Sequence, residues 1–269
     1  MEEKPRKTYY GVSLIGASEV KKLFEELEQM PAKSFDTYLI AYIDFLGMKD
    51  KMKKDNSYSS LRKLQALLKG VRQKASFIEK INSIDDFEMK VFSDNIIIAL
   101  KVKKEILARQ IVSIVNIVSL LQFEAMFQFG FPLRGGITIG ELYIDDTVVW
   151  GTGLIEAYQI EDKLANYPRV IISKNVIETY EKQEDIEFDL SAFIRQDTDG
   201  YWFVHYLIAA PNITLIPVLS NNLAELASSC ADGNDRVKQK INWLISYFNN
   251  HCREFRNRGD YEKYVIPFI

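Results

Sequence analysis

The stretch TYLIAYIDFLG, Thr37–Gly47, places an acid at the end of an apolar run and then turns through a glycine. A short run that is rich in Ile and Tyr and ends at a Gly is typical of a buried strand. We therefore predict a strand over residues 39–45. Asp44 at its end has an ordinary explanation, because Asp favours bends and turns. Taken alone, this carboxylate indicates no chemistry.

The patterns before and after this strand give an order of elements. Helical spacing of apolar residues predicts helices, and extended runs bounded by turn residues predict strands. The expected elements are a helix over residues 20–30, the strand 39–45, a helix over 60–81, paired strands over 87–92 and 95–101, a helix over 104–127, a second hairpin over 132–150 that breaks near Asp145 and Asp146, a helix over 154–164, strands over 169–173 and 199–207, and a closing helix over 237–255. This order predicts an α+β sandwich with a mostly antiparallel sheet covered by helices, rather than a parallel doubly wound fold.

The composition limits the function classes. The chain has 269 residues, of which 47% are hydrophobic, and this fits one domain with a sizeable core. Its formal net charge of −3 provides no broad basic field, so we expect no nucleic-acid partner. The longest apolar run, residues 111–121, is interrupted by Ser and Asn and is too short for a membrane span. We therefore expect no membrane partner.

Cysteine and histidine are scarce in this chain. Cys230 and Cys252 have neither metal-ligand nor disulfide-framework spacing, and the N-terminal residues MEEKPRK form no apolar signal segment, so we expect a reducing cytoplasm. The two histidines, His205 and His251, are a poor supply for a zinc site or a histidine-based triad. His205 lies in the expected strand WFVHYL, where we expect it to be structural.

A second acid lies at the bend of the first expected hairpin, where Ser93 and Asp94 separate the two strands. If the strand that carries Asp44 lies beside this hairpin, both carboxylates point off the same edge of the sheet. Two such acids repel each other unless a cation lies between them. Mg²⁺ or Mn²⁺ needs only one or two carboxylates together with substrate phosphates, and two such ions can activate an attacking oxygen and stabilise a leaving one. Asp44 and Asp94 are therefore candidate metal ligands.

Three motifs in this order resemble those of the class III nucleotide cyclases. An acid and a Gly follow the first strand (Asp44-Phe45-Leu46-Gly47), a second acid lies in the next hairpin (Ser93-Asp94), and a later strand has the pattern Arg-x-Gly-Ile-x-x-Gly (Arg134–Gly140). The resemblance covers about residues 38–207 and implies a class III adenylyl/guanylyl cyclase-like sandwich with a ferredoxin-like core. It implies one domain over residues 1–269, in which 1–37 are an N-terminal extension and 208–269 a C-terminal strand and helix.

A narrower resemblance is to the pyrimidine cyclases of the bacterial Pycsar antiphage systems. It rests on the phrases AYIDFLG, FSDNI, PLRGGITIG, GTGLIEAYQIE, TDGYWFVHYL and KQKINWLISYFN, which occur here in the same order. The resemblance implies a uridylate or cytidylate cyclase whose cyclic UMP or cyclic CMP activates a separately encoded effector protein. We favour UTP over CTP as the substrate, although no single residue decides between them.

The resemblance assigns roles to the matching positions. Asp44, Asp94 and the backbone carbonyl of Phe45 would hold two Mn²⁺ or Mg²⁺ ions, in agreement with the preference of hard cations for oxygen ligands. Gly47 marks a sharp bend that would let the phosphates of the substrate approach. Arg134 would meet the triphosphate, because a guanidinium group suits phosphate oxygens and stabilises the departing pyrophosphate. Its ordinary alternative is a surface ion pair.

Two further positions are assigned to substrate binding. Lys90 lies four residues before Asp94, where adenylyl cyclases place the lysine that contacts the base, and its three N–H donors suit a ring nitrogen or a carbonyl. An exposed strand lysine is the alternative. Arg195 lies near the position of the phosphate-binding lysine of the family. Tyr158 is either a wall of the base pocket or part of the core.

The chain departs from the adenylyl cyclase pattern at three positions. Val148 replaces the base-reading Asp, and Ile155 and Gln159 replace the Asn and Arg that orient the ribose and stabilise the transition state. Because a site built to hydrogen-bond one base rejects others strongly, the loss of the Asp argues against ATP. The loss of the Arg requires that another cation substitutes or that the enzyme is slow.

The implied reaction is attack of the ribose 3′-oxygen on the α-phosphorus, in line with departing pyrophosphate. Class III sites form between two cyclase domains, so one domain per chain implies a homodimer with two equivalent sites. Two alternatives stay open. One is a degenerate cyclase fold that binds a nucleotide or regulates a partner without catalysis. The other is a palm-like polymerase or another nucleotidyltransferase, against which the absence of a basic stripe counts.

Overall fold

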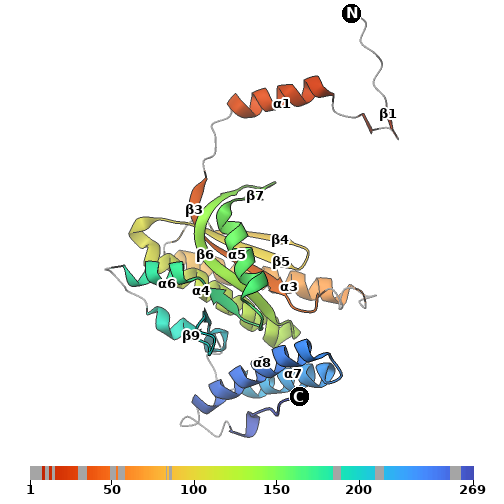
Figure 1. The fold of residues 1–269 in the computed structure, drawn as a ribbon, viewed down its shortest axis with the longest axis vertical. Coiled ribbons are helices and arrows are strands. Elements are labelled where there is room, and N and C mark those ends of the chain that lie inside the picture. Colours follow the sequence, from red (N-terminus) through yellow and green to blue (C-terminus); the bar gives the residue numbers. More distant parts are fainter. Residues whose placement is uncertain are drawn as a thin grey trace, which may run out of the picture. The chain divides into compact units, whose positions relative to one another are not determined.

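The computed structural model describes residues 8–9, 12–13, 16–29, 35–48, 53, 58–82, 84, 87–183, 189–209, 215–254 and 262–269 (Figure 1). The chain divides into two compact units, residues 1–35 and 36–269. In the first unit, β1 (Thr8–Tyr9) pairs antiparallel with β2 (Val12–Ser13), and α1 spans Ala17–Gln29. The helix predicted over residues 20–30 is therefore present and begins three residues earlier.

The second unit is built on an eight-stranded sheet in the described residues, with strand order β4-β5-β3-β6-β8-β10-β9 and β7 paired with β6. All neighbouring strands are antiparallel except β6 and β8. The strands are β3 (Asp36–Phe45), β4 (Phe87–Phe92), β5 (Asn95–Lys101), β6 (Leu133–Ile144), β7 (Val149–Trp150), β8 (Val170–Ile172), β9 (Ile194–Gln196) and β10 (Trp202–Val204). The predicted mostly antiparallel α+β sheet is confirmed.

The first half of this unit has the chain order β3-α3-β4-β5-α4-β6, where α3 is Ser59–Asn82 and α4 is Leu107–Phe129. Its four strands lie in the order β4-β5-β3-β6, which is the split βαβ arrangement of ferredoxin-like folds. A 3₁₀ turn, Lys104–Ile106, precedes α4. The predicted ferredoxin-like core is therefore confirmed by the strand order itself.

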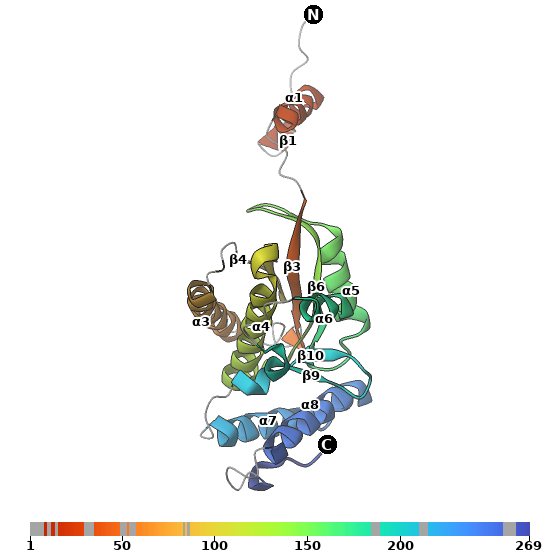
Figure 2. The same cartoon turned by 90° about the vertical axis from the view of Figure 1, so that its left-hand side faces the viewer.

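The alternation along β3 separates the two faces of the sheet. Leu39, Ala41, Ile43 and Phe45 belong to the main hydrophobic core, which includes buried residues of α3 and α4. Asp44 lies on the opposite face, because successive side chains of a strand point to opposite sides. Figure 2 shows α3 and α4 on one side of the sheet and α5 (Thr152–Lys163) on the other.

Three glycines allow α5 to pack directly on β6. A Cβ atom at Gly136 would lie 2.6 Å from the carbonyl oxygen of Ala157, and one at Gly140 would lie 2.6 Å from the Cα of Gly153. No side chain fits in this contact, so helix and strand meet backbone to backbone. The glycines of the Arg134–Gly140 motif thus have a structural purpose, which is to bring α5 close to the sheet.

The C-terminal part contains more helix than the sequence patterns predicted. The strand expected over residues 199–207 ends at Val204, and Tyr206–Ala209 is a 3₁₀ turn. The strand expected within 208–269 does not occur in the described part of that segment, where a helix, α7 (Ile216–Cys230), precedes α8 (Asp235–Glu254) and a short 3₁₀ turn (Glu262–Tyr264). Strand β9, helix α6 (Lys174–Glu181) and a 3₁₀ turn (Leu190–Phe193) were also not predicted.

Helices α7 and α8 lie side by side and share a second hydrophobic cluster with the end of α4 and with Phe203 of β10. Leu219, Leu223 and Ala227 of α7 are buried at helical spacing. Arg169 connects the sheet to α8. It is fully buried and forms ion pairs with Asp197 and Asp199, and its guanidinium carbon lies 5.8 Å from the ring centroid of Trp243 on α8.

One helix in the described residues, Lys104–Met126, is long and apolar enough to cross a membrane by composition. It is longer than the apolar run 111–121, but 67% of its most apolar window is buried inside the structure. The 0% exposure of Ile111, Ile114 and Leu121 is what a central core helix requires.

Candidate functional site

Asp44 lies on the third strand of the sheet, between β5 and β6. In the antiparallel register it is opposite Asn95 on β5 and opposite Arg134 on β6. The carboxylate accepts a hydrogen bond from Nε of Arg134 at 3.2 Å, and the Asp44 side chain is 19% exposed. The apolar strand thus ends in a half-buried carboxylate that directly faces a guanidinium group.

Asp94 lies at the bend between β4 and β5, next to the end of β3. The N–H of Phe45 donates to the backbone carbonyl of Asp94 at 3.1 Å, which fixes the hairpin bend against the residue after Asp44. The bend requires Ser93 to adopt φ = 57°, a left-handed conformation. The structure therefore brings Asp44 and Asp94 to the same edge of adjacent strands, as the sequence predicted.

The Asp94 side chain is 5% exposed. Within the part of the chain that the structure describes, its carboxylate forms no hydrogen bond or ion pair with another side chain. Two carboxylate groups at the same end of neighbouring strands, one of them without a side-chain partner among the described residues, fit the oxygen ligands that Mg²⁺ or Mn²⁺ takes from a protein.

Arg134 is held by a second acid that the sequence analysis did not identify. Its Nη2 lies 2.6 Å from Oε1 of Glu161 on α5, and its Nη1 lies 3.4 Å from the backbone carbonyl of the same residue. Glu161 is 3% exposed. Burial raises the pKa of Glu161 to about 7, with the Arg134 charge acting in the opposite direction and the Asp44 charge adding to the rise. The guanidinium group therefore lies between two acids from different elements.

Two more residues belong to the same electrostatic cluster. Burial, followed by the charges of Glu161 and Asp44, raises the pKa of Tyr42 to about 12, so its hydroxyl stays protonated. Lys240 on α8 has its pKa lowered, first by burial and then by the Arg134 charge, while Asp44 and Glu161 raise it. The C-terminal helix thus contributes a cation to the electrostatic field of Asp44 and Glu161.

Phe45 and Gly47 frame the end of β3. Phe45 is 2% exposed and packs edge to face against Phe131, with ring centroids 6.0 Å apart. Gly47 has φ = 76°, and a Cβ atom there would meet nothing within 4 Å. The bend after the acid is therefore open, and its left-handed backbone favours glycine.

Lys90 lies on β4, which neighbours β5 and not β3. Its Nζ is 3.5 Å from Oδ1 of Asp146 in the β6–β7 turn and 3.6 Å from Oε2 of Glu88. The structure thus places Lys90 on the same half of the sheet as Asp94 but pairs its ammonium group with Asp146 and Glu88.

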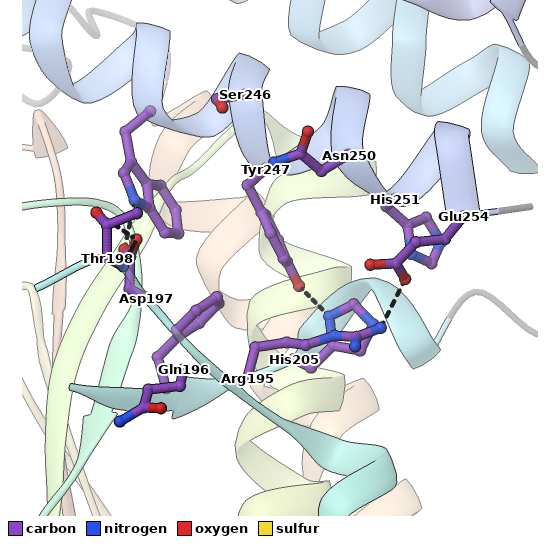
Figure 3. Close-up of a pocket in the computed structure, with 12 residues that line it drawn as sticks. Arg195, Gln196, Asp197, Thr198, His205, Ser246, Tyr247, Asn250, His251 and Glu254 are labelled. Carbon is purple, nitrogen blue, oxygen red and sulfur yellow. Dashed lines mark hydrogen bonds and ion pairs between the residues drawn. The ribbon is translucent and has the colours of Figure 1, made fainter. Parts of the chain in front are cut away.

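Arg195 lies elsewhere. It is on β9, the outermost strand at the far end of the sheet from β4, so three strands separate it from β3. Its Nη2 is 2.6 Å from Oε2 of Glu254 on α8, in the pocket shown in Figure 3. Within one chain, Arg195 is therefore not part of the Asp44–Asp94 cluster.

The positions that depart from the adenylyl cyclase pattern are exposed. Val148 and Ile155 are 45% and 56% exposed and Gln159 is also exposed, but the strand register places Val148 beyond the opposite end of β3 from Asp44. Tyr158, in the same helix as Ile155, is 46% exposed. The Tyr158 ring contacts Tyr42 edge to face, with centroids 5.6 Å apart. Tyr158 is therefore a surface residue that reaches the acid cluster, and the core alternative for it is wrong.

No known family model matches the chain, and no curated protein matches it. Among solved structures, the chain is similar to the guanylyl cyclase Cya2, with 12% identity, 64% of this chain and 92% of that chain covered, and a TM-score of 0.39. It is also similar to the adenylyl cyclase CyaB from P. aeruginosa, with 12% identity, coverage of 64% and 94%, and a TM-score of 0.41.

A third similar structure is the monomeric guanylyl cyclase domain of the RhoGC fusion protein from the aquatic fungus Blastocladiella emersonii. The identity is 10%, 64% of this chain and 95% of that chain are covered, and the TM-score is 0.42. All three of these similar proteins are adenylyl or guanylyl cyclases.

Proposed function

We propose that this protein is a metal-dependent pyrimidine nucleotide cyclase. It converts UTP or CTP to the 3′,5′-cyclic monophosphate and pyrophosphate, with UTP favoured, and serves as the second-messenger synthase of a Pycsar antiphage system. Its cyclic nucleotide acts on a separate effector protein in the cytoplasm. The sequence motifs around Asp44, Asp94 and Arg134 motivate the proposal.

The observation that carries the proposal is the position of Asp44. Asp44 pairs with Asn95 of β5, the residue after Asp94, and on its other side it pairs with Arg134 of β6. Asp94 and the Asp44–Arg134 ion pair therefore lie at the same end of these neighbouring strands. This combination suits a cation that is shared between protein carboxylates and a triphosphate, with an arginine for the phosphate oxygens.

The chain's residues divide the work as follows. Asp44, Asp94 and the Phe45 carbonyl would hold Mn²⁺ or Mg²⁺, which supplies charge stabilisation for the attacking and leaving oxygens. Gly47 leaves room beside them, because no side chain fills the bend. Arg134 is oriented by Glu161, so that its guanidinium group faces the Asp44 carboxylate. With Asp44 serving as a metal ligand, Nε of Arg134 would be available to donate to a phosphate oxygen.

A homodimer completes the proposal. Trp150 on β7 and Ile155 and Tyr158 on α5 expose large apolar side chains. Exposed apolar surface of this kind often marks a contact with another chain. In a homodimer, the second copy would supply the substrate-binding groups that a single chain keeps apart from its acids.

A catalytically degenerate nucleotide-binding module is the second candidate. Arg134 is engaged by both Asp44 and Glu161, and Ile155 and Gln159 lack the polar groups of active adenylyl cyclases. Such a module would bind a nucleotide without turnover.

One experiment distinguishes the two candidates. The purified chain is incubated with each of the four ribonucleoside triphosphates and Mn²⁺, and products are identified by mass. The cyclase predicts cyclic UMP or cyclic CMP, whereas the degenerate module predicts no product although the same nucleotide raises its melting temperature. The cyclase proposal fails if UTP and CTP both remain unchanged.

A further inference from the structure

A pocket of about 340 Å³ lies between β9, the end of β10 and helix α8. Figure 3 shows His205, His251 and Glu254 turned toward one another on one side of it, with the Tyr247 hydroxyl joined to the His205 ring by a dashed line. The pocket is at the far end of the sheet from β4, three strands away from the strand of Asp44. It is therefore separate from the proposed cyclase site of the same chain.

One ring nitrogen of His205 has a hydrogen-bond partner, and the other has none among the described residues. The ring is 2% exposed, and its Nδ1 lies 2.7 Å from the hydroxyl oxygen of Tyr247, which also accepts the N–H of Leu207 at 3.2 Å. Nε2 is buried and has no hydrogen-bond partner within the described ranges. A buried ring nitrogen without a partner is unfavourable in either tautomer, as an N–H donor or as a lone pair.

Helix α8 brings two more donors to this point. His251 and Glu254 are three residues apart and therefore lie on one face of the helix. The rings of His205 and His251 are 5.4 Å apart at their centroids. One donor atom from each of His205, His251 and Glu254 lies within 4.8 Å of the others. The fold thus brings His205, which follows β10, close to His251 and Glu254 of α8, which lie 46 and 49 positions later in the sequence.

The three side chains offer donor atoms that suit a transition metal. Two histidines and one glutamate are a known ligand set for Zn²⁺, with a fourth position left open.

Arg195 is the group that opposes a cation here. Its guanidinium lies 2.6 Å from Glu254, but the two side chains are 44% and 48% exposed. An ion pair this exposed contributes little stability, so Glu254 can exchange this partner at small cost. Tetrahedral zinc with ligands at about 2.0–2.1 Å holds its donor atoms about 3.3 Å apart, so binding would require small rotations of the two imidazoles as well as of the exposed Glu254.

We propose that His205, His251 and Glu254 form a binding site for a zinc-type divalent transition metal, with the open coordination position facing the pocket. Tyr247 orients His205 so that Nε2 faces the ion, a role that hydrogen-bonded partners of metal-binding histidines commonly have. The bound ion would link β10 to α8. Two histidines alone indicated no zinc site, because no local sequence pattern brings Glu254 close to His205.

The test uses tag-free full-length protein in which Asp44→Asn and Asp94→Asn remove the other candidate metal site. We expect one Zn²⁺ per chain in a titration against a chromophoric chelator. Because the chain has two histidines, NMR spectra of ¹⁵N-histidine-labelled protein should show zinc-dependent shifts of both. Zn²⁺ should also raise the melting temperature.

Matched variants in the same background separate metal binding from folding. His251→Gln and Glu254→Gln should each weaken zinc binding at least tenfold, and the exposed Glu254 can be replaced without disturbing the core. Arg195→Gln should strengthen zinc binding several-fold, because it removes the competing cation. The proposal is overturned if no zinc binds, if neither histidine signal shifts, or if folded Glu254→Gln binds Zn²⁺ as well as its parent.

Discussion

Arg134 and Asp44 face each other across β6 and β3, with Nε of the arginine 3.2 Å from the carboxylate, and Glu161 holds the other end of the same guanidinium group at 2.6 Å. Arg134, which the sequence motif assigns to triphosphate binding, thus forms ion pairs with both Asp44 and Glu161. One of these acids is also a proposed metal ligand. Metal binding and the release of Arg134 are therefore coupled in this account.

Asp94 should serve function more than stability. In Asp94→Asn the amide has nearly the same shape and breaks no side-chain hydrogen bond or ion pair of the described residues, so the free energy of unfolding should change by less than about 1 kcal/mol. Cyclase activity should fall about 100-fold or more, since a metal ligand contributes several kcal/mol to the transition state. Urea unfolding and product formation measure the two effects.

Asp36→Asn is the control for this change. Asp36 pairs with Lys101 at 2.6 Å at the other end of β3, and both side chains are over a third exposed. Its replacement should change the free energy of unfolding by less than about 1 kcal/mol and leave activity unchanged. A large loss of stability in Asp94→Asn would show that this carboxylate stabilises the fold and would contradict a mainly functional role.

The raised pKa of Glu161 predicts a dependence of stability on pH. Its pKa is about 7 in the folded chain against 4.5 for an unperturbed Glu, so the folded state binds a proton more tightly than the unfolded state. This group's contribution is therefore fully present below about pH 4.5 and is lost as the pH rises to about 7. Glu161→Gln cannot ionise and lacks this loss.

The measurement is urea unfolding of parent and Glu161→Gln at pH 5 and pH 7.5. The stability of the variant relative to the parent should improve at the higher pH by about 2–3 kcal/mol, from a shift of about two units. If the difference between the two proteins is the same at both pH values, Glu161 is ionised throughout and its assignment is wrong.

Close packing of α5 on β6 should make Gly136 irreplaceable. In Gly136→Ala the new Cβ would meet the carbonyl of Ala157 at 2.6 Å and the Cβ of Ile160 at 2.6 Å. We expect a loss of about 2–3 kcal/mol in the free energy of unfolding, because backbone must move. The helix that carries Glu161 would shift with it, so activity should fall as well.

Gly70→Ala should instead raise the free energy of unfolding. Gly70 lies within α3, where an added Cβ meets nothing within 4 Å, and Ala in a helix interior is more stable than Gly by about 0.5–1 kcal/mol. Thermal or urea unfolding compares the two variants. Equal behaviour of Gly136→Ala and Gly70→Ala would show that the contact between α5 and β6 is loose.

The proposed homodimer predicts an effect of charge on the exposed apolar face. Trp150→Glu and Ile155→Glu together should convert a particle of twice the 31.1-kDa chain mass into a monomer. Activity should be lost with it, because the site needs groups from two chains. Phe77→Glu on α3, where Phe77 is 65% exposed, should change neither. Sedimentation equilibrium measures the mass, and a monomeric parent with full activity would refute the dimer.

The sequence predicted the part of the fold that depends on local patterns. The apolar run of β3, the hairpin around Ser93 and the Gly-rich β6 each show their element within a few residues, so their neighbourhood followed once an antiparallel sheet was assumed. Helix α7 was not predicted. The apolar residues after position 207 were expected to form a strand, whereas Leu219 and Leu223 have helical spacing. Such short apolar runs fit either period.

The site divides in the same way. Asp44, Asp94 and Arg134 are brought together by strand register, which the sequence patterns imply. Glu161 looks like a surface acid in EAYQIEDK, and its burial depends on how closely α5 sits on Gly136. Arg195 was a candidate because it lies near a motif in the sequence, whereas three strands lie between its strand, β9, and β3 in the sheet. Contacts set by tertiary packing left no local signal.

The most direct test of the central claim is product formation by the parent and by Asp44→Asn, with UTP and CTP in separate reactions containing Mn²⁺. The account predicts that the parent forms one pyrophosphate for each cyclic UMP or cyclic CMP, and that folded Asp44→Asn is slower by about 100-fold or more. Equal rates in parent and variant, or no cyclic pyrimidine nucleotide from the parent, would contradict it.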